Sequence, residues 1–474
     1  MKIDNKKLSL FEDNSMISIL FFSLYSAWQL SFVFQGQVLF ILFEKYSVSL
    51  SNITLFSIAA LFIGLILSGY LVDKLEKSRA TLIWITVFSI AGTLIFYLPY
   101  SFLWDISLII LSFISGIYIA AWGFYYKTYS TSNNRVKTIA KALIFSNLIM
   151  VIINIIAINL SPYIGLTLAI LCLVTSLLVI KKSSSPKEKT NNEAITNIVD
   201  ISKPVLLLYI FIAIITVTSG LMYQVINPAY SHHRAFASWY WAVPYLVALY
   251  ILMKSSKKVN KAYILYLAIA MIGLSFVFFL ILDRSVLSYI IVNTLMMGAF
   301  GVCDLFWWSI IGELLDYVKN PAKLLGLGLS ANVLGILIGS AIGAKINIMS
   351  NTLNSASFAL LIVFLILIIL PLLNKHLSII INEHIFLFRI YNYEKEIIDD
   401  RISIRKKYPN LTDRENEIVE LLLSGRTYKM IAEELFLSEN TIKTHIKNIY
   451  SKYNIQSKAE LIKALQEILV TQKR

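Results

Sequence analysis

The stretch that decides the organisation of this chain lies near its C-terminal end, at residues 411–461, and reads LTDRENEIVELLLSGRTYKMIAEELFLSENTIKTHIKNIYSKYNIQSKAEL. Gly425 is a natural helix stop, and Thr427 and Ser438 are side chains typical of helix N-caps. From about residue 439 to 453, apolar side chains recur every three or four positions, which predicts a helix with one buried face. This buried stripe comprises Ile442, Ile446, Ile449 and Tyr453.

The opposite face of the predicted 439–453 helix is polar and basic. It presents Thr441, Lys443, Thr444, Lys447 and Asn448. Two helices joined by a tight turn, of which the second is polar and basic outside, predict a helix-turn-helix that reads double-stranded DNA. The alternative is a three-helix bundle with a merely solvated charged face, but such a bundle does not require this order of residues.

The same stretch resembles the LuxR-type DNA-binding domain, a helix-turn-helix module of bacterial transcriptional regulators. The residues that match its pattern at fixed spacing are Leu411, Thr412, Arg414, Glu415, Leu422, Gly425, Lys429, Ile431, Ala432, Leu435, Leu437, Ser438, Thr441, Ile442, Lys443, His445, Asn448, Ile449, Tyr450 and Lys452. The resemblance implies transcription regulation through sequence-specific binding of DNA.

The resemblance also implies roles for single residues. Lys443, Thr444 and Lys447 occupy the base-contacting positions of the family. The remaining expected DNA-binding residues, several of them nearer the phosphate backbone, are Thr427, Lys429, Ser438, Thr441, His445 and Asn448. For His445, packing against the preceding helix is an open alternative.

Related domains pair through their last helix, where this chain carries Ile462, Leu465 and Leu469. These residues are expected either to form a homodimer contact or to pack within one domain. RNA polymerase is a further candidate partner, as for other regulators of transcription.

The rest of the chain has a different composition. Hydrophobic residues make up 57% of the sequence, charged residues 15%, and the mean hydropathy is +0.71, which is too apolar for a soluble protein of 474 residues. Apolar runs of about twenty residues, enough to cross a hydrocarbon core of about 30 Å, follow one another from residue 16 to 374. The twelve predicted spans lie roughly at 16–42, 50–72, 80–98, 105–125, 139–160, 163–181, 204–226, 236–253, 262–282, 285–311, 324–345 and 355–374.

Positive charge is distributed unevenly among the predicted loops. With the N-terminus inside, most lysines and arginines of the short loops fall on the cytoplasmic side, whereas Lys45, Arg234, Arg284 and Lys345 fall outside. The positive-inside rule therefore predicts a multi-pass protein of the cytoplasmic membrane with both termini in the cytoplasm, where DNA is accessible.

A polar loop at residues 182–203 divides the spans into six and six. This layout, and the pattern Gly69-x-Leu71-x-Asp73-Lys74-x-x-Lys77-x-Arg79 after the second span, resembles the major facilitator superfamily. The resemblance implies two six-helix bundles around a central cavity, with Gly69, Asp73, Lys74, Lys77 and Arg79 as a latch between the bundles. The alternative for these residues is an ordinary positively charged inner loop.

Two departures from that family count against proton-coupled transport. Glu76 stands where the loop usually carries a second glycine, and Ser112 stands where many proton-coupled members carry an arginine.

Polar side chains within the predicted spans are candidates for a binding site, because they are costly in hydrocarbon. Asp304 is the clearest, and it shares a helical stripe with Asn293 and Trp308. Gln29 in the first span and Asn147 in the fifth are further ligand-binding candidates. The alternatives are a structural ion pair or hydrogen bond for Asp304, hydrogen bonds between helices for Gln29, and a packing role for Asn147 and for Trp308.

The sequence shows no catalytic triad, nucleotide loop or metal-ligand spacing, so no enzyme activity, cofactor or metal is expected. The expected fold is all-α, with a major-facilitator-like bundle of about twelve transmembrane helices at 1–374, a juxtamembrane linker at 375–408 and a four-helix LuxR-type domain at 409–474. The favoured function is a membrane-bound one-component transcriptional regulator whose bundle senses a small molecule. The alternative is a solute transporter with an appended regulatory DNA-binding tail, and a third possibility is a bundle that serves only as an anchor.

Overall fold

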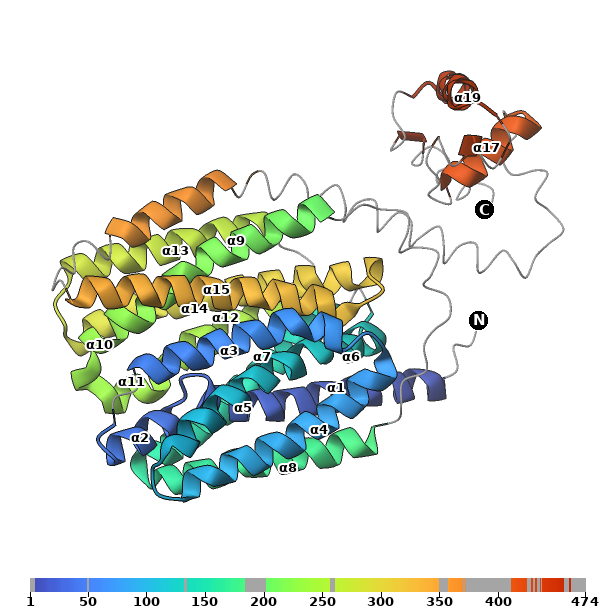
Figure 1. Ribbon diagram of the computed structural model, residues 1–474. Helices are drawn as coiled ribbons and strands as arrows, with labels where there is room; N and C mark the ends of the chain where they lie inside the picture. Colours follow the sequence, from blue (N-terminus) through green and yellow to red (C-terminus); the bar gives the residue numbers. More distant parts are fainter. Residues whose placement is uncertain are drawn as a thin grey trace. The chain divides into compact units, whose positions relative to one another are not determined.

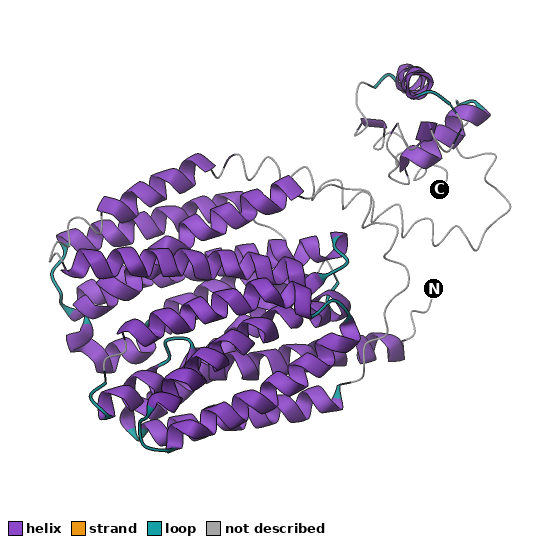
Figure 2. Cartoon of the chain, in the orientation of Figure 1, coloured by secondary structure: helices purple, strands orange, loops and turns teal. Residues whose placement is uncertain are grey.

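The computed structural model describes residues 5–48, 51–131, 134–183, 202–255, 261–348, 357–369, 371, 411–423, 428, 431–432, 435, 437–455 and 460–461. All regular elements among these residues are helical (Figure 2). The chain divides into two compact units, which are treated separately below. The membrane unit contains Met1–Thr196 and Ile201–Asn374, and the reader unit contains Asn197–Asp200 and Lys375–Arg474.

The membrane unit consists of two successive sets of helices (Figure 1). The first half contains α1 (Asn5–Trp28), η1 (Gln29–Val33), α2 (Gln37–Lys45), α3 (Ser51–Leu71), α4 (Leu75–Leu94), η2 (Ile95–Tyr97), α5 (Phe102–Ala121), α6 (Gly123–Tyr129), α7 (Arg135–Asn159) and α8 (Pro162–Lys182). The second half contains α9 (Ser202–Leu221), η5 (Met222–Ile226), α10 (Asn227–Ala229), η6 (Ser231–His233), α11 (Arg234–Tyr240), α12 (Ala242–Ser255), α13 (Lys261–Ile281), α14 (Val286–Leu314), η7 (Leu315–Tyr317) and α15 (Pro321–Ile348). A shorter apolar helix covers Ser357–Ile369.

Eleven helical segments among the described residues are long and apolar enough to cross a membrane. The twelfth predicted span, 355–374, coincides with the shorter helix Ser357–Ile369, and its remaining residues, apart from 371, lie outside the described ranges. Large apolar side chains face outward along the long helices: Trp84, Phe88 and Leu267 are 62%, 61% and 62% exposed. Lipid chains are the solvent that such a surface requires.

The two halves meet along α3, α5 and α7 of the first half and α12, α14 and α15 of the second half. Small residues let helices approach closely where α15 crosses α9. A Cβ atom added at Gly339 would lie 2.1 Å from the carbonyl oxygen of Val217, so a larger residue would push the two helices apart.

The first helix of each half is interrupted at a corresponding place. A π-helical turn, η1, follows α1, and a second, η5, follows α9. After η1 the chain turns sharply: Gln35 has a φ of 52°, and a Cβ at Gly36 would lie 1.9 Å from the carbonyl carbon of Ser31. Such interruptions expose backbone and polar side chains only where protein or a cavity surrounds them, which directs attention to the space between the halves.

In the reader unit the described residues form α17 (Asp413–Leu423) and α19 (Glu439–Tyr453) around an apolar core. The bounds of α19 confirm the helix predicted at about residues 439–453. Its cap is also as predicted: the Ser438 hydroxyl accepts a hydrogen bond from the Thr441 backbone N–H at 3.1 Å. The core contains Leu411, Ile418, Val419, Leu422, Ile431, Ala432, Ile442, Ile446, Ile449 and Leu461.

Several predictions concern residues outside the described ranges. These are most of the loop 182–203, the linker 375–408, the stop at Gly425, the DNA contacts Thr427 and Lys429, and the pairing residues Ile462, Leu465 and Leu469.

Candidate functional site

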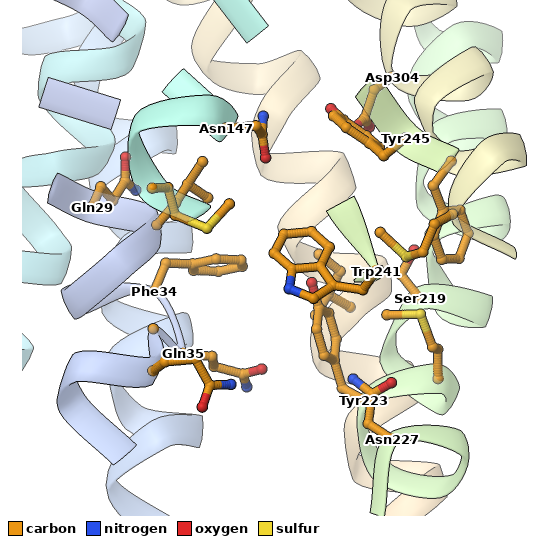
Figure 3. A pocket seen from close by; sticks show the side chains of 18 of the residues that line it. Gln29, Phe34, Gln35, Asn147, Ser219, Tyr223, Asn227, Trp241, Tyr245 and Asp304 are labelled. Atoms are coloured by element: carbon orange, nitrogen blue, oxygen red, sulfur yellow. The ribbon is translucent and has the colours of Figure 1, made fainter. Parts of the chain in front are cut away.

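A cavity of about 830 Å³ lies between the two halves of the membrane unit. Helices from both halves line it, among them α1, α7 and α14. All five predicted ligand-binding residues contribute to its lining: Gln29, Asn147, Asn293, Asp304 and Trp308. Sequence positions nearly three hundred residues apart in the chain are thus brought to one space, as Figure 3 shows for Gln29, Asn147 and Asp304.

Asp304 is half-buried on α14 and lines the cavity. The Tyr245 hydroxyl of α12 donates a hydrogen bond of 2.7 Å to its Oδ2 atom, and the two side chains lie together in Figure 3. Within the described residues Asp304 has no ion-pair partner, so the alternative of a structural ion pair finds no support among them.

The other predicted residues are held by their own helices or by ring contacts. The Asn147 side-chain amide donates to the Leu143 carbonyl oxygen at 2.8 Å, one turn earlier on α7. Gln29 is 4% exposed at the start of η1, and its backbone carbonyl accepts from the Phe34 N–H. Trp308 meets the rings of Phe22 and Trp122 edge to face across the two halves.

Several cavity residues were missed by the sequence reasoning. Figure 3 shows Phe34 from the first half and Trp241 from the second half pointing into the same space, with Tyr223, Tyr245 and Asn227 nearby. Aromatic residues are frequent in every span of this chain, so hydropathy alone does not single these out. For Phe34, Tyr223 and Asn227 the structural signal is the pair of corresponding interruptions after α1 and α9, whereas Trp241 caps the end of α11 and Tyr245 lies on α12.

Further contacts join the two halves through residues that do not line the cavity. Arg135 at the start of α7 is 1% exposed and forms a bidentate ion pair with Asp316 of η7, at 2.8 Å and 2.5 Å. The Lys127 ammonium donates to the Val318 carbonyl oxygen at 2.8 Å. These contacts, with the one from Asn320 to Gly69 described next, are called the seal.

Of the five predicted latch residues, Gly69 takes part in a hydrogen bond between the halves. The Gly69 carbonyl oxygen accepts from the Asn320 side-chain amide at 2.7 Å. Asp73 forms an exposed ion pair with Lys77 at 2.7 Å, which keeps the pKa of the Asp73 carboxyl below its ordinary value. Arg79 donates to the carbonyl oxygens of Lys181 and Ser183 within the first half, and Lys74 is exposed. Among the described residues, Arg135–Asp316 is the ion pair that joins the halves, and the sequence reasoning did not identify it.

The predicted DNA-binding face of α19 is accessible in the reader unit. Ser438, Lys443, Thr444, Lys447 and Asn448 are exposed, whereas Thr441 and His445 are half-buried. The Lys443 ammonium lies 2.8 Å from the Glu439 carboxylate one turn earlier, an exposed pair that competes weakly with a phosphate or a base.

A polar contact between α17 and α19 stabilises the helix that carries this face. The Glu415 carboxylate accepts from the Thr412 backbone N–H at 2.8 Å, forming a capping box at the start of α17, and pairs with Lys452 of α19 at 2.5 Å. Burial alone would raise the pKa of the Glu415 carboxyl, but the hydrogen bonds and charge of Lys452 and Thr412 outweigh burial and hold the pKa below its ordinary value. The two helices are thereby clamped at a point away from the exposed face.

Comparison with known proteins agrees with both units. Residues 409–465 match the model of the family described as bacterial regulatory proteins, luxR family. The spore germination protein GerE of Bacillus subtilis is 43% identical over 54 residues, which are 11% of this chain and 73% of GerE. The transcriptional regulatory protein LiaR of the same organism is 45% identical over 53 residues, 11% of this chain and 25% of LiaR. The regulator MalT of Vibrio cholerae is 41% identical over 90 residues, 17% of this chain and only 10% of MalT.

Among solved structures, the membrane unit is similar to a bacterial homologue of the iron transporter ferroportin in an outward-facing state, with a TM-score of 0.55 and 13% identity over 77% of this chain and 99% of that one. It is also similar to the major facilitator superfamily transporter FucP in the outward conformation, with a TM-score of 0.53 and 13% identity over 76% of this chain and 98% of FucP. Identity this low concerns the fold alone.

The fold and the reader together define the class: a multi-pass membrane protein with a major-facilitator-like bundle and a C-terminal helix-turn-helix. By that C-terminal domain the chain belongs to the luxR family of bacterial regulatory proteins. The predicted all-α fold and the luxR-family resemblance are confirmed, and the solved structures confirm the predicted major-facilitator-like fold of the membrane unit.

Proposed function

We propose that the protein is a membrane-bound, one-component transcriptional regulator of the cytoplasmic membrane, in which the cavity senses a small molecule and the reader unit binds DNA. The single observation that carries the proposal is the presence, in one chain, of a luxR-family reader and a cavity lined by polar groups. The functional division follows the boundaries 1–374, 375–408 and 409–474, and the lysine and arginine distribution supports cytoplasmic termini. No catalytic step or cofactor is part of this proposal.

In this proposal α19 enters the major groove with its N-terminal part first. Lys443, Thr444 and Lys447 are exposed on one face and contact base edges, while Ser438 and Thr441 lie at the helix N-terminus, where the backbone N–H groups attract phosphate. Thr427, Lys429, His445 and Asn448 complete the contact set. Two copies are proposed to pair through the last helix on inverted half-sites, and RNA polymerase is the proposed partner at the promoter.

Sensing requires that the ligand bind one arrangement of the two halves more tightly than the other, since equal affinity for both shifts nothing. The seal lies between the cavity and the loops that the charge distribution assigns to the cytoplasm. A ligand that favours or opposes the sealed arrangement would therefore change the surface of the membrane unit on the side of the DNA.

The test is a footprint of the full-length protein in nanodiscs on its own promoter region. Lys443→Ala is expected to weaken binding by about 1–3 kcal/mol and to relax specificity at one base pair. Lys182→Ala removes an exposed lysine from the membrane unit and serves as the matched control, with no expected effect on the footprint. An unchanged footprint and transcript profile for Lys443→Ala would rule out direct regulation through this face.

The second candidate is a solute transporter with a regulatory tail. The likeness of the membrane unit to outward-facing transporters favours it. Uptake of a labelled solute into vesicles that is lost on Asp304→Asn would establish this reading, whereas ligand binding without uptake favours the receptor.

A further inference from the structure

The cavity is lined by acidic and uncharged side chains. Its ionisable lining residues, tyrosines aside, are Glu44 and Asp304, and no lysine, arginine or histidine occurs among the described residues that line it. A low-dielectric space with acidic groups and no basic ones attracts cations and repels anions. The protein as a whole carries a net charge of +14, which by itself would attract anions. The preference of the cavity for cations therefore comes from its own lining residues.

Asp304 is the main acidic group behind this preference for cations. The carboxylate faces the cavity from within a membrane-spanning helix, receives one hydrogen bond from Tyr245, and meets no cationic side chain among the described residues. A carboxylate at such a depth is costly unless a positive charge accompanies it. A cationic group on a bound molecule would supply that charge.

Aromatic rings define the rest of the ligand. Tyr223, Trp241 and Tyr245 lie on the side of the cavity where Asp304 lies, and aromatic faces attract organic cations as well as apolar groups.

A metal ion fits this site poorly. No group of three or more histidine, cysteine, aspartate or glutamate residues that could hold a metal occurs in the described part of the chain. Divalent metals prefer several such ligands at once, and Asp304 offers one carboxylate among aromatic rings. The surroundings instead match a protonated or quaternary nitrogen attached to an apolar body.

We propose that the cavity binds an organic monocation, with the charged centre beside Asp304 and Tyr245 and the apolar body against the rings of Tyr223 and Trp241. The inference deepens the proposed sensor role, on which it rests for its biological meaning, by naming the chemical class of the ligand.

The experiment uses the full-length protein in nanodiscs and a pair of probes with the same shape and opposite charge, tetraphenylphosphonium and tetraphenylborate. Equilibrium dialysis with labelled tetraphenylphosphonium is expected to show saturable binding that tetraphenylborate does not displace. Asp304→Asn should weaken this binding on the order of tenfold or more, because a charge-assisted contact is lost. Asp304→Glu, which keeps the charge, should retain most of it.

The matched control is Asp283→Asn, which removes a carboxylate from an exposed loop outside the cavity. Binding to this variant should equal binding to the wild type. The proposal is overturned if tetraphenylphosphonium shows no saturable binding, if Asp304→Asn binds it equally well, or if Mn²⁺ alone displaces it in a manner that depends on Asp304.

A failure of cation binding can be distinguished from a failure of the proposed regulatory function. Asp304→Asn leaves the DNA-binding face intact, so its footprint without any probe should match the wild type. Saturable cation binding that leaves the footprint unaltered would support the site and overturn the sensor role, and loss of regulation in Lys443→Ala is independent of cation binding.

Discussion

The reader unit and the cavity of the membrane unit place their polar residues in opposite ways. In the reader, the polar face belongs to one helix, α19, and its residues are near neighbours in the chain. In the cavity, Gln29, Asn147 and Asp304 come from three helices and two halves. The difference teaches that a surface made by one helix can be read from periodicity, whereas an enclosed site depends on how distant helices pack.

The two regions also differ in how their charges are stabilised. Glu415 and Lys452 join two helices of a small module, and the pair sits beside a capping box that already fixes the start of α17. Arg135 and Asp316 join two halves of the large bundle across 181 positions of sequence. Breaking the Glu415–Lys452 pair should therefore affect only the small module. Breaking the Arg135–Asp316 pair should change how the two halves of the bundle are held together.

The largest effect is expected in the seal. Asp316→Ala leaves the buried Arg135 guanidinium without its carboxylate, which should cost the sealed arrangement about 3–5 kcal/mol. The halves should separate at that end, because the alternative arrangement lets water reach the arginine. Spin labels at Tyr70→Cys and Lys319→Cys, one in each half, with both native cysteines replaced, would report a longer distance in full-length protein.

Asp73→Ala is the matched control for this experiment, since it breaks an exposed ion pair within the first half. It should leave the distance distribution unchanged. A seal that holds without Asp316 would show the same distances in both variants, and the role given to the Arg135–Asp316 pair would then be wrong.

A smaller effect is expected in the reader. Glu415→Ala removes the acceptor of the Thr412 N–H and the partner of Lys452, and should destabilise the reader unit by about 2–3 kcal/mol. Hydrogen exchange of the α19 amides in the full chain would measure the loss of protection. Glu417→Ala, on the same helix but in an exposed pair with Arg414, should change protection by less than about 0.5 kcal/mol.

The smallest effect is a pH dependence of the same contact. The folded-state pKa of Glu415 lies below its ordinary value of 4.5, so its contribution to stability is present above that value and is lost as the pH falls through the folded-state pKa. Protection of α19 should therefore decline on acidification more steeply in the wild type than in Glu415→Gln. Parallel declines in the two proteins would contradict this assignment.

Sequence patterns predicted much of this protein, for identifiable reasons. The helix 439–453, its Ser438 cap and its buried isoleucines follow from a periodicity confined to one helix. The membrane spans follow from hydropathy, because about twenty apolar residues must cross the bilayer wherever they pack. Asp304 and Asn293 could be proposed as cavity residues because polar groups in hydrocarbon are costly and therefore conspicuous.

The packing of the helices determined the long-range contacts that these sequence patterns do not specify. The pairing of Tyr245 with Asp304 joins α12 to α14, and the pairing of Arg135 with Asp316 joins α7 to η7. In the sequence, Arg135 was one basic loop residue among many, and the conspicuous latch pattern drew attention to Asp73 and Arg79 instead. The sequence alone thus determined the kinds of helices, the Ser438 cap and the exposed polar face of α19, because these depend on neighbours a few positions away. Only the tertiary structure decided which polar groups share the cavity and which charge pair closes it, because those contacts depend on the packing of helices far apart in the chain.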